Sequence, residues 1–214
     1  MRGGTTRWAL VVAAVVAALV GLAACAADPS EPTPPAASPD AGGPVVSPFE
    51  PCPRLPSSAP SDPPSDPAAG AGPDADVLTG ITLACFDQRT DVPLTQLGRP
   101  AVVNLWASWC EPCRRELPEL QRLAEQAGDD LVVLGVVTED SPERAASLAQ
   151  DLGVTFPAVL DPSAEVRRAV GALGLPLTLL VGPDGVVRHV HRTGALDLPA
   201  ATELVRTHLG VELG

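Results

Sequence analysis

The sequence predicts one α/β domain over residues 76–214, with a central mixed sheet flanked by helices. Two observations carry this prediction. Short runs of β-branched and aromatic residues alternate with apolar stripes of helical spacing, and residues that start or end helices stand between them. The first 75 residues differ, because an apolar stretch is followed there by a segment rich in proline, alanine and serine that offers few groups for a core.

The first part of the domain reads as a strand, a helix and a strand. Residues 100–106 (PAVVNLW) and 131–138 (LVVLGVVT) have the composition of buried strands. Between them, apolar residues spaced by three and four positions form a helix stripe, and Gly128 suits the end of that helix. The stripe consists of Leu117, Leu120, Ala124 and Ala127. Two strands joined by a helix indicate a parallel crossover.

The second part predicts two more helix starts, a hairpin and a final helix. Ser141 before Pro142 is typical of an N-cap, with a helix that runs to about Leu152, and Asp161 before Pro162 starts another helix in the same manner. Two strands flank the turn GPDG, which is typical of a β-hairpin. The two strands are residues 177–181 and 186–190, and the last helix covers residues 198–209 before Gly210.

Composition and charge exclude several kinds of function. The net charge is -12 at pH 7, so nucleic acid is not an expected partner. Every one of the 14 Lys+Arg residues is an arginine. The absence of lysine excludes Schiff-base chemistry and a phosphate-binding loop of the type that needs a lysine.

The N-terminus predicts export. Residues 1–24 contain two arginines, an apolar run and then small residues, as a secretory signal peptide does. The residues before Cys25 resemble a bacterial lipobox, which implies that this cysteine is lipidated and anchors an extracytoplasmic lipoprotein to the cell membrane. An uncleaved membrane-spanning anchor is the alternative. Residues 25–75 are expected to form a disordered, proline-rich tether.

The stretch WASWCEPCRRELP (residues 106–118) places two cysteines at the start of the first predicted helix. A reversible dithiol needs two sulfurs close enough to bond and one thiol that ionises easily. The helix start supplies both, because the helix dipole stabilises a thiolate at an exposed Cys110, whereas Cys113 lies one turn further in and is shielded. Cys110 is therefore expected to attack a substrate disulfide and Cys113 to resolve the mixed disulfide.

Metal binding is an alternative use of this pair. A closed zinc site needs four ligands, and neither a second CxxC nor a nearby histidine pair accompanies these cysteines. His189 and His191 share a strand face but stand far away in sequence, and we interpret them as surface residues. We therefore expect no resident metal, although copper(I) binding stays open because soft thiolates bind this ion. Two inert core cysteines are a further alternative.

The motifs WASWCEPCRRELP and GLPLTLLVGPDG, with the lipobox and tether, resemble the TlpA/ResA-like branch of thioredoxin-like proteins over roughly residues 77–214. The resemblance implies a thioredoxin-like fold, with residues 154–172 as the central insertion of that branch. It also implies a cis-proline at Pro176, preceded by Leu175, that faces the CxxC. The expected substrate-binding residues are Trp109, Pro112, Leu175 and Pro176.

The expected function is that of a membrane-tethered, extracytoplasmic thiol-disulfide oxidoreductase. It would act on protein substrates with disulfides or thiols through the redox-active cysteine pair, without a further cofactor. The resemblance favours reduction, as in cytochrome c maturation or copper-site assembly, with electrons from an upstream membrane donor. A disulfide-forming oxidase and a non-catalytic copper-binding or assembly module are the alternatives.

Glu116 is the candidate proton acceptor. Classical thioredoxins carry a buried aspartate at the strand position that Asn104 occupies here, and an amide cannot accept a proton. Glu116 follows Cys113 by three positions, so the two lie on the same helix face, and it matches an acid that functions in ResA-like proteins. The alternative is a solvated surface glutamate. Glu111, between the cysteines, is expected to face solvent.

Cys52 and Cys85 remain outside the active-site motif. In an oxidising compartment an even pair of this kind most simply forms a structural disulfide, which would join part of the tether to the first strand. Two free thiols are the alternative, because connectivity does not follow from sequence.

Overall fold

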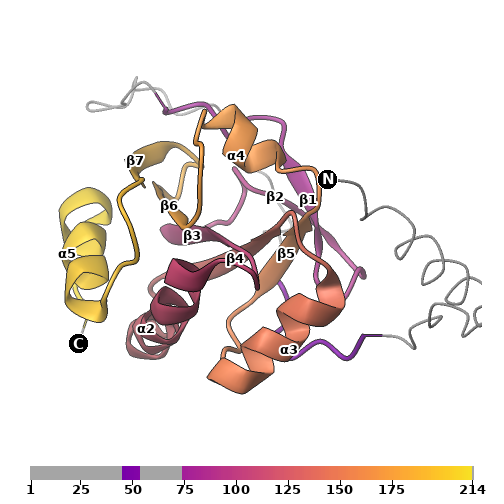
Figure 1. Ribbon diagram of the computed structural model, residues 1–214. Helices are drawn as coiled ribbons and strands as arrows, with labels where there is room; N and C mark the ends of the chain where they lie inside the picture. Colours follow the sequence, from indigo (N-terminus) through magenta and orange to yellow (C-terminus); the bar gives the residue numbers. More distant parts are fainter. Residues whose placement is uncertain (1–44, 54–73, 214) are drawn as a thin grey trace, which may run out of the picture. The chain divides into compact units, whose positions relative to one another are not determined.

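A computed structural model describes residues 45–53 and 74–213 (Figure 1). Within these residues the chain forms one sheet of seven strands and four helices. The strands are β1 (Thr82–Cys85), β2 (Asp91–Pro93), β3 (Ala101–Trp106), β4 (Val132–Thr138), β5 (Ala158–Asp161), β6 (Leu177–Val181) and β7 (Val187–His191). The helices are α2 (Glu111–Ala127), α3 (Pro142–Leu152), α4 (Glu165–Ala169) and α5 (Leu198–Leu209).

The strands lie in the order β2-β1-β5-β4-β3-β6-β7, which places β3 near the centre of a mixed sheet. β3 pairs parallel with β4 and antiparallel with β6. In the second pairing Leu105 lies opposite Leu177. The residue that precedes β6 therefore lies beside the end of β3, where the CxxC motif follows. This is the predicted thioredoxin-like architecture.

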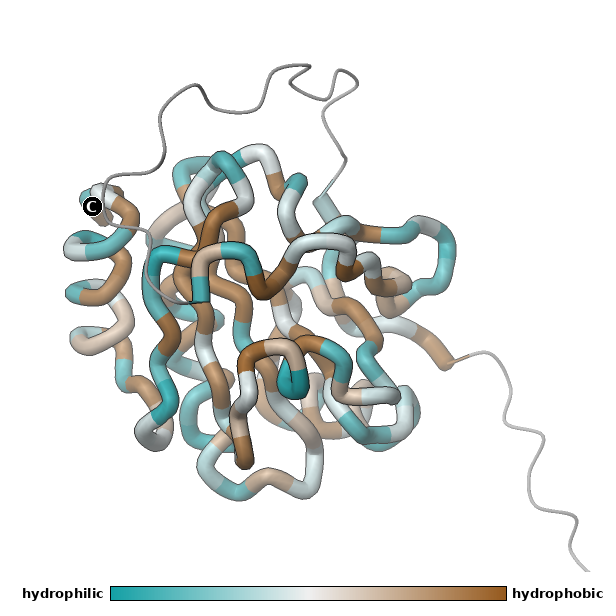
Figure 2. Tube along the Cα trace, turned by 90° about the horizontal axis from the view of Figure 1, so that it is seen from above, coloured by the Kyte–Doolittle hydropathy of each residue, from teal (hydrophilic) through white to brown (hydrophobic). Residues whose placement is uncertain are grey.

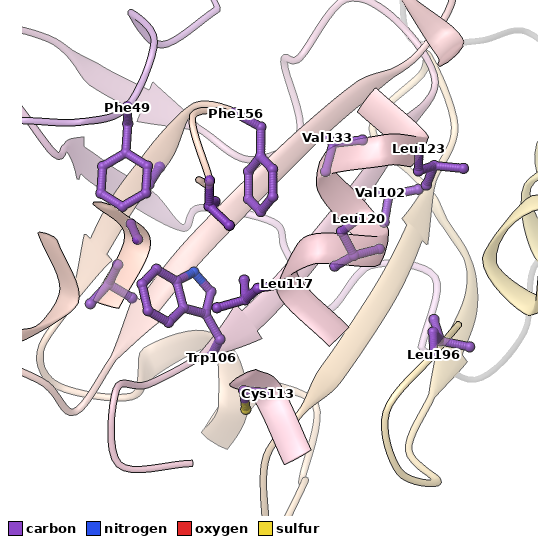
Figure 3. Packing of buried hydrophobic residues seen from close by; sticks show 14 of the residues in the cluster. Phe49, Val102, Trp106, Cys113, Leu117, Leu120, Leu123, Val133, Phe156 and Leu196 are labelled. Atoms are coloured by element: carbon purple, nitrogen blue, oxygen red, sulfur yellow. The ribbon is translucent and has the colours of Figure 1, made fainter. Parts of the chain in front are cut away.

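Helices cover both faces of the sheet, and alternate residues of β3 serve two separate cores. Val102 and Trp106 point into a cluster that also contains the buried faces of α2, α3 and α5 (Figure 3). Val103 and Leu105 point into the second cluster, which α4 and the segment from Leu78 to Leu97 cover. Hydrophobic segments accordingly run through the interior, while the outer turns are mostly hydrophilic (Figure 2).

The helix ends agree well with the local signals. Ser141 is the N-cap of α3 and accepts a hydrogen bond from the backbone N–H of Arg144. Asp197 caps α5 in the same way, and Gly210 ends that helix with a φ of 68°. Side chains with short polar groups and glycines in the left-handed region are the usual solutions at these two kinds of helix end.

Two predicted boundaries are wrong. The helix predicted to begin after Asp161 begins at Glu165, because Asp161 is still the last residue of β5. Its buried carboxylate accepts hydrogen bonds from the backbone N–H groups of Glu165 and Val166 at 2.7 and 3.1 Å, so it stabilises the helix start from four residues away. The second hairpin strand is Val187–His191, one residue later than predicted, and the β6–β7 pair has a register shift.

Part of the segment expected to be a tether is packed on the domain. Phe49 is buried, its ring lies edge-on to Phe86 with 4.7 Å between centroids, and it also approaches Trp106 (Figure 3). Residues 45–53 therefore contribute to the core, although they fall within the predicted tether 25–75. The predicted signal peptide, residues 1–24, lies outside the described residues. None of the helices in the described parts of the chain has the length and apolarity needed to cross a membrane.

Candidate active site

The CxxC motif lies where the sequence analysis places it, at the N-terminus of α2. Cys110 is the N-cap, with extended backbone, and its sulfur accepts a hydrogen bond from the backbone N–H of Cys113 at 3.3 Å. The two sulfurs form a disulfide. Pro112 occupies the first turn of the helix, where a missing N–H leaves no internal hydrogen bond unmade. The pair thus has the geometry of a reversible dithiol at a positive helix end.

Cys110 is less accessible than predicted. Cys113 is fully buried, as expected, but Cys110 is only 4% exposed in the disulfide form. Trp109, which precedes it, is 59% exposed and is one of the few large apolar side chains on the described surface. Trp109 is therefore the exposed apolar side chain next to Cys110.

The loop before β6 faces the active site. The Leu175–Pro176 peptide bond is cis. Because Leu105 pairs with Leu177, Pro176 lies beside the last residue of β3, and the motif follows that strand after a single turn. Leu175 is half-buried and packs against the core cluster that contains both cysteines. All four residues expected to bind substrate thus belong to the two segments that meet at this end of the sheet.

Glu116 is fully buried and not solvated. One carboxylate oxygen accepts a hydrogen bond from the side-chain amide of Asn104 at 3.0 Å. The other accepts from the Thr178 hydroxyl at 3.3 Å and from the backbone N–H of Leu196 at 3.2 Å. Side chains from β3 and β6 and a backbone group before α5 therefore bind this acid of α2, one helical turn from Cys113.

Burial dominates the electrostatics of this acid. It raises the pKa of Glu116 from 4.5 to about 7, although the hydrogen bonds from Leu196, Asn104 and Thr178 favour the charged form and act in the opposite direction. A carboxyl with a pKa close to neutral can both accept and return a proton under physiological conditions.

Neither Thr178 nor Leu196 is predicted from the sequence to contact Glu116. Thr178 is detectable in retrospect, because it is a polar residue inside an apolar strand and pairs with Asn104 in the sheet register. Leu196 contributes only its backbone N–H, so its side chain carries no signal of this contact.

Cys52 and Cys85 form a second disulfide, with an S–S distance of 2.04 Å and 33 positions between them in sequence. Both are buried, and the bond joins the packed segment 45–53 to the end of β1. Cys25, the expected lipidation site, lies outside the described residues.

The three histidines of the chain approach one another at β7 and α5. The rings of His189 and His208 stack with 4.2 Å between centroids, and their planes differ by 11°. Desolvation, and then the charges of His208, His191 and Arg192, lower the pKa of His189. Parallel stacked rings direct their nitrogens into separate planes, and no group of metal-ligating side chains suited to an ion occurs among the described residues.

A mixed sheet, a disulfide-bonded CxxC at the start of the following helix and a cis-proline beside it define a thioredoxin-like protein with a redox-type disulfide. Residues 77–190, more than half of the chain, match the model of the AhpC/TSA family. The protein belongs to that family.

Individual proteins that the chain resembles are named as thiol-disulfide interchange proteins and oxidoreductases. The chain is 33% identical to the thiol:disulfide interchange protein DsbE of Allochromatium vinosum over 111 residues, which cover 51% of this chain and 60% of that protein. It is 32% identical to the thiol-disulfide oxidoreductase ResA of Halalkalibacterium halodurans over 101 residues, which cover 47% of this chain and 57% of that protein. The matched part therefore spans less than two thirds of each relative.

A solved structure supports the fold. The secreted thiol-disulfide isomerase from Corynebacterium glutamicum superposes with a TM-score of 0.53 at 23% identity, over 61% of this chain and 81% of that one.

Proposed function

We propose that this protein is an extracytoplasmic thiol-disulfide oxidoreductase that reduces disulfides in protein substrates. The observation that carries the proposal is the Cys110–Cys113 disulfide at the N-terminus of α2, with Pro176 beside it and the buried carboxyl of Glu116 one turn away. The names of the curated relatives, which are thiol-disulfide interchange proteins and oxidoreductases, support the same reaction class.

The reaction needs only the two cysteines and the substrate. The Cys110 thiolate attacks one sulfur of the substrate disulfide, which forms a mixed disulfide and releases one substrate thiolate. The Cys113 thiolate then attacks Cys110, which forms the Cys110–Cys113 bond and releases the second substrate thiolate. Two electrons pass from the pair to the substrate, and an upstream thiol donor at the membrane must return them.

The burial of Cys113 makes the second step depend on a proton acceptor. A thiol in an apolar environment resists ionisation, so its proton must pass to a nearby base before it can attack. The neighbouring strand residue, Asn104, is an amide and cannot serve. Glu116, with a pKa of about 7, is matched to this transfer at neutral pH.

The proposal also covers the cellular location of the protein and the direction of electron transfer. The predicted signal peptide and Cys25 would place the protein outside the cytoplasm on a lipid anchor, with part of residues 25–75 as a spacer between the lipid surface and the domain. The resemblance to ResA-like proteins favours reduction of thiol pairs in proteins such as apocytochromes or copper-site proteins.

The test is capture of reaction intermediates with the full chain in membranes. Cys113→Ala leaves an attacking thiol without a resolving one, so it should accumulate mixed disulfides with substrates on Cys110. Cys110→Ser should accumulate none, because the buried Cys113 is not the attacking group. Non-reducing electrophoresis followed by identification of the linked proteins reads out both variants, and equal trapping would contradict the assignment of roles.

A further inference from the structure

The turn that presents Cys110 is held from outside the active-site motif. Residues 107–110 form a tight turn closed by a hydrogen bond from the backbone N–H of Cys110 to the carbonyl of Ala107 at 3.1 Å. The two central residues of this turn, Ser108 and Trp109, each contact the loop between β4 and α3, about 30 positions further along the chain. We call residues 107–110 the turn and residues 139–141 the brace.

Asp140 is the principal contact of the brace. Its side chain has no exposed surface, although its immediate partner Arg144 is 66% exposed. One carboxylate oxygen accepts a hydrogen bond from the backbone N–H of Ser108 at 2.5 Å. The other accepts from the backbone N–H of Ser141 at 2.9 Å and from the guanidinium of Arg144 at 3.1 Å. A buried carboxylate with this many donors has a single preferred position.

A second hydrogen bond also joins the turn to the brace. The indole N–H of Trp109 donates to the carbonyl of Glu139 at 3.0 Å. Glu139 adopts a φ of 51°, a region that residues other than glycine rarely occupy. Its carboxylate pairs with Arg167 of α4, and its backbone N–H donates to the backbone carbonyl of Asp161. The brace is therefore fixed in turn by the insertion that contains α4.

We propose that Asp140 is a positioning residue for the attacking cysteine. Its hydrogen bond to Ser108 fixes the turn, and the turn fixes Cys110 in the extended N-cap conformation in which its sulfur faces the backbone N–H of Cys113. Those helix-start donors are what stabilise a thiolate on Cys110. The inference deepens the proposed function, on which it rests, because it names a residue that acts on Cys110 without touching the substrate.

Asp140 could also act simply through its negative charge, which would disfavour a nearby thiolate. Positioning by Asp140 and repulsion by its charge change the reaction rate of Cys110 in opposite directions. If position matters, moving or removing the carboxylate slows the reaction of Cys110. If charge matters, removing it speeds that reaction, and moving it by one methylene changes little.

Three variants separate these effects. Asp140→Ala removes the acceptor, and Asp140→Glu keeps the charge but displaces the acceptor. Asp140→Asn removes the charge but keeps an oxygen that can accept from Ser108, while its NH2 group replaces the oxygen that accepts from Ser141 and Arg144. Arg144→Ala is the matched control, because it removes one partner of Asp140 and leaves the bond to Ser108 intact.

The readout is the rate at which iodoacetamide alkylates Cys110 in the reduced protein, measured from pH 5 to 9, together with kcat/KM for reduction of a small protein disulfide. We expect Asp140→Ala and Asp140→Glu to lower both quantities about tenfold or more, and to move the half-maximal alkylation rate to higher pH. Asp140→Asn should stay within about threefold of the unchanged protein, as should Arg144→Ala.

The stability of each variant is measured by urea unfolding. If Asp140→Ala does not fold, Asp140→Glu is used to test the proposal. Variants that lose stability but keep the alkylation rate and its pH profile would overturn the proposal, as would faster alkylation in Asp140→Ala and Asp140→Asn. Failure of the proposed function looks different, since the unchanged protein would then alkylate normally but reduce no protein disulfide.

Discussion

Replacing Glu116 by glutamine tests both the electrostatics and the chemistry of the active site. A carboxyl whose pKa is higher in the folded than in the unfolded chain stabilises the folded state. This contribution is complete at a pH below the pKa of the unfolded chain, and it is lost as the pH rises through the pKa of the folded chain. For Glu116 the pKa is 4.5 in the unfolded chain and about 7 in the folded chain. The free energy of unfolding should therefore fall by about 3 kcal/mol from this residue between pH 4.5 and pH 8.

Urea unfolding of the oxidised protein at a series of pH values measures this slope. Glutamine has the shape of glutamate but does not titrate, so Glu116→Gln should lack that part of the decrease. Its amide also brings a donor toward either the Asn104 amide or the backbone N–H of Leu196, and this mismatch changes stability by a similar amount at every pH. The difference in slope, and not the absolute stability, is therefore the informative quantity.

The kinetic arm follows the second chemical step. Decay of the mixed disulfide, measured by stopped flow, should be slowed about tenfold or more in Glu116→Gln, and its rate should no longer follow a titration near pH 7. Glu111→Gln is the matched control, because Glu111 lies on the exposed side of the same helix and pairs only with Arg115 among the described residues. Equal slopes and equal decay rates in Glu116→Gln and the unchanged protein would refute the role of the buried acid.

Three further predictions concern the rest of the chain. Replacing Cys52 and Cys85 by alanine should lower the free energy of unfolding by at most about 3.7 kcal/mol, the chain-entropy value for a loop of this length, as measured by urea unfolding under non-reducing conditions. Gly135→Ala should destabilise by about 1–3 kcal/mol, because its Cβ would lie 2.8 Å from the indole nitrogen of the buried Trp106, and an unchanged melting temperature would contradict this packing. Cys25→Ser should move the protein from the membrane fraction to the soluble fraction with its thiol activity intact, whereas retention without lipid labelling would favour an uncleaved anchor.

Much of the fold follows from local patterns. The run PAVVNLW, the caps at Ser141 and Gly210 and the turn GPDG each determine their own element, because strand composition, helix capping and turn formation depend on residues close in sequence. Where the local rule misplaces a helix start, the same side chain stabilises that start from another element. Asp161 resembles an N-cap in the sequence but belongs to β5, and its carboxylate serves the start of α4 from there.

The same division holds for the active site. By itself, the sequence determined the helix-start position of Cys110 and Cys113 and placed Glu116 on the face of Cys113, since a spacing of three residues fixes a helix face. Only the tertiary structure decided that Glu116 is buried, because the groups that enclose it come from β3, β6 and the loop before α5, up to 80 positions away. The hydrogen bond from Ser108 to Asp140 also depends on the tertiary structure. Parallel pairing of β3 and β4 brings the two loops that follow these strands to one edge of the sheet. Contacts of this kind depend on how the elements pack against one another, and no local sequence pattern specifies them.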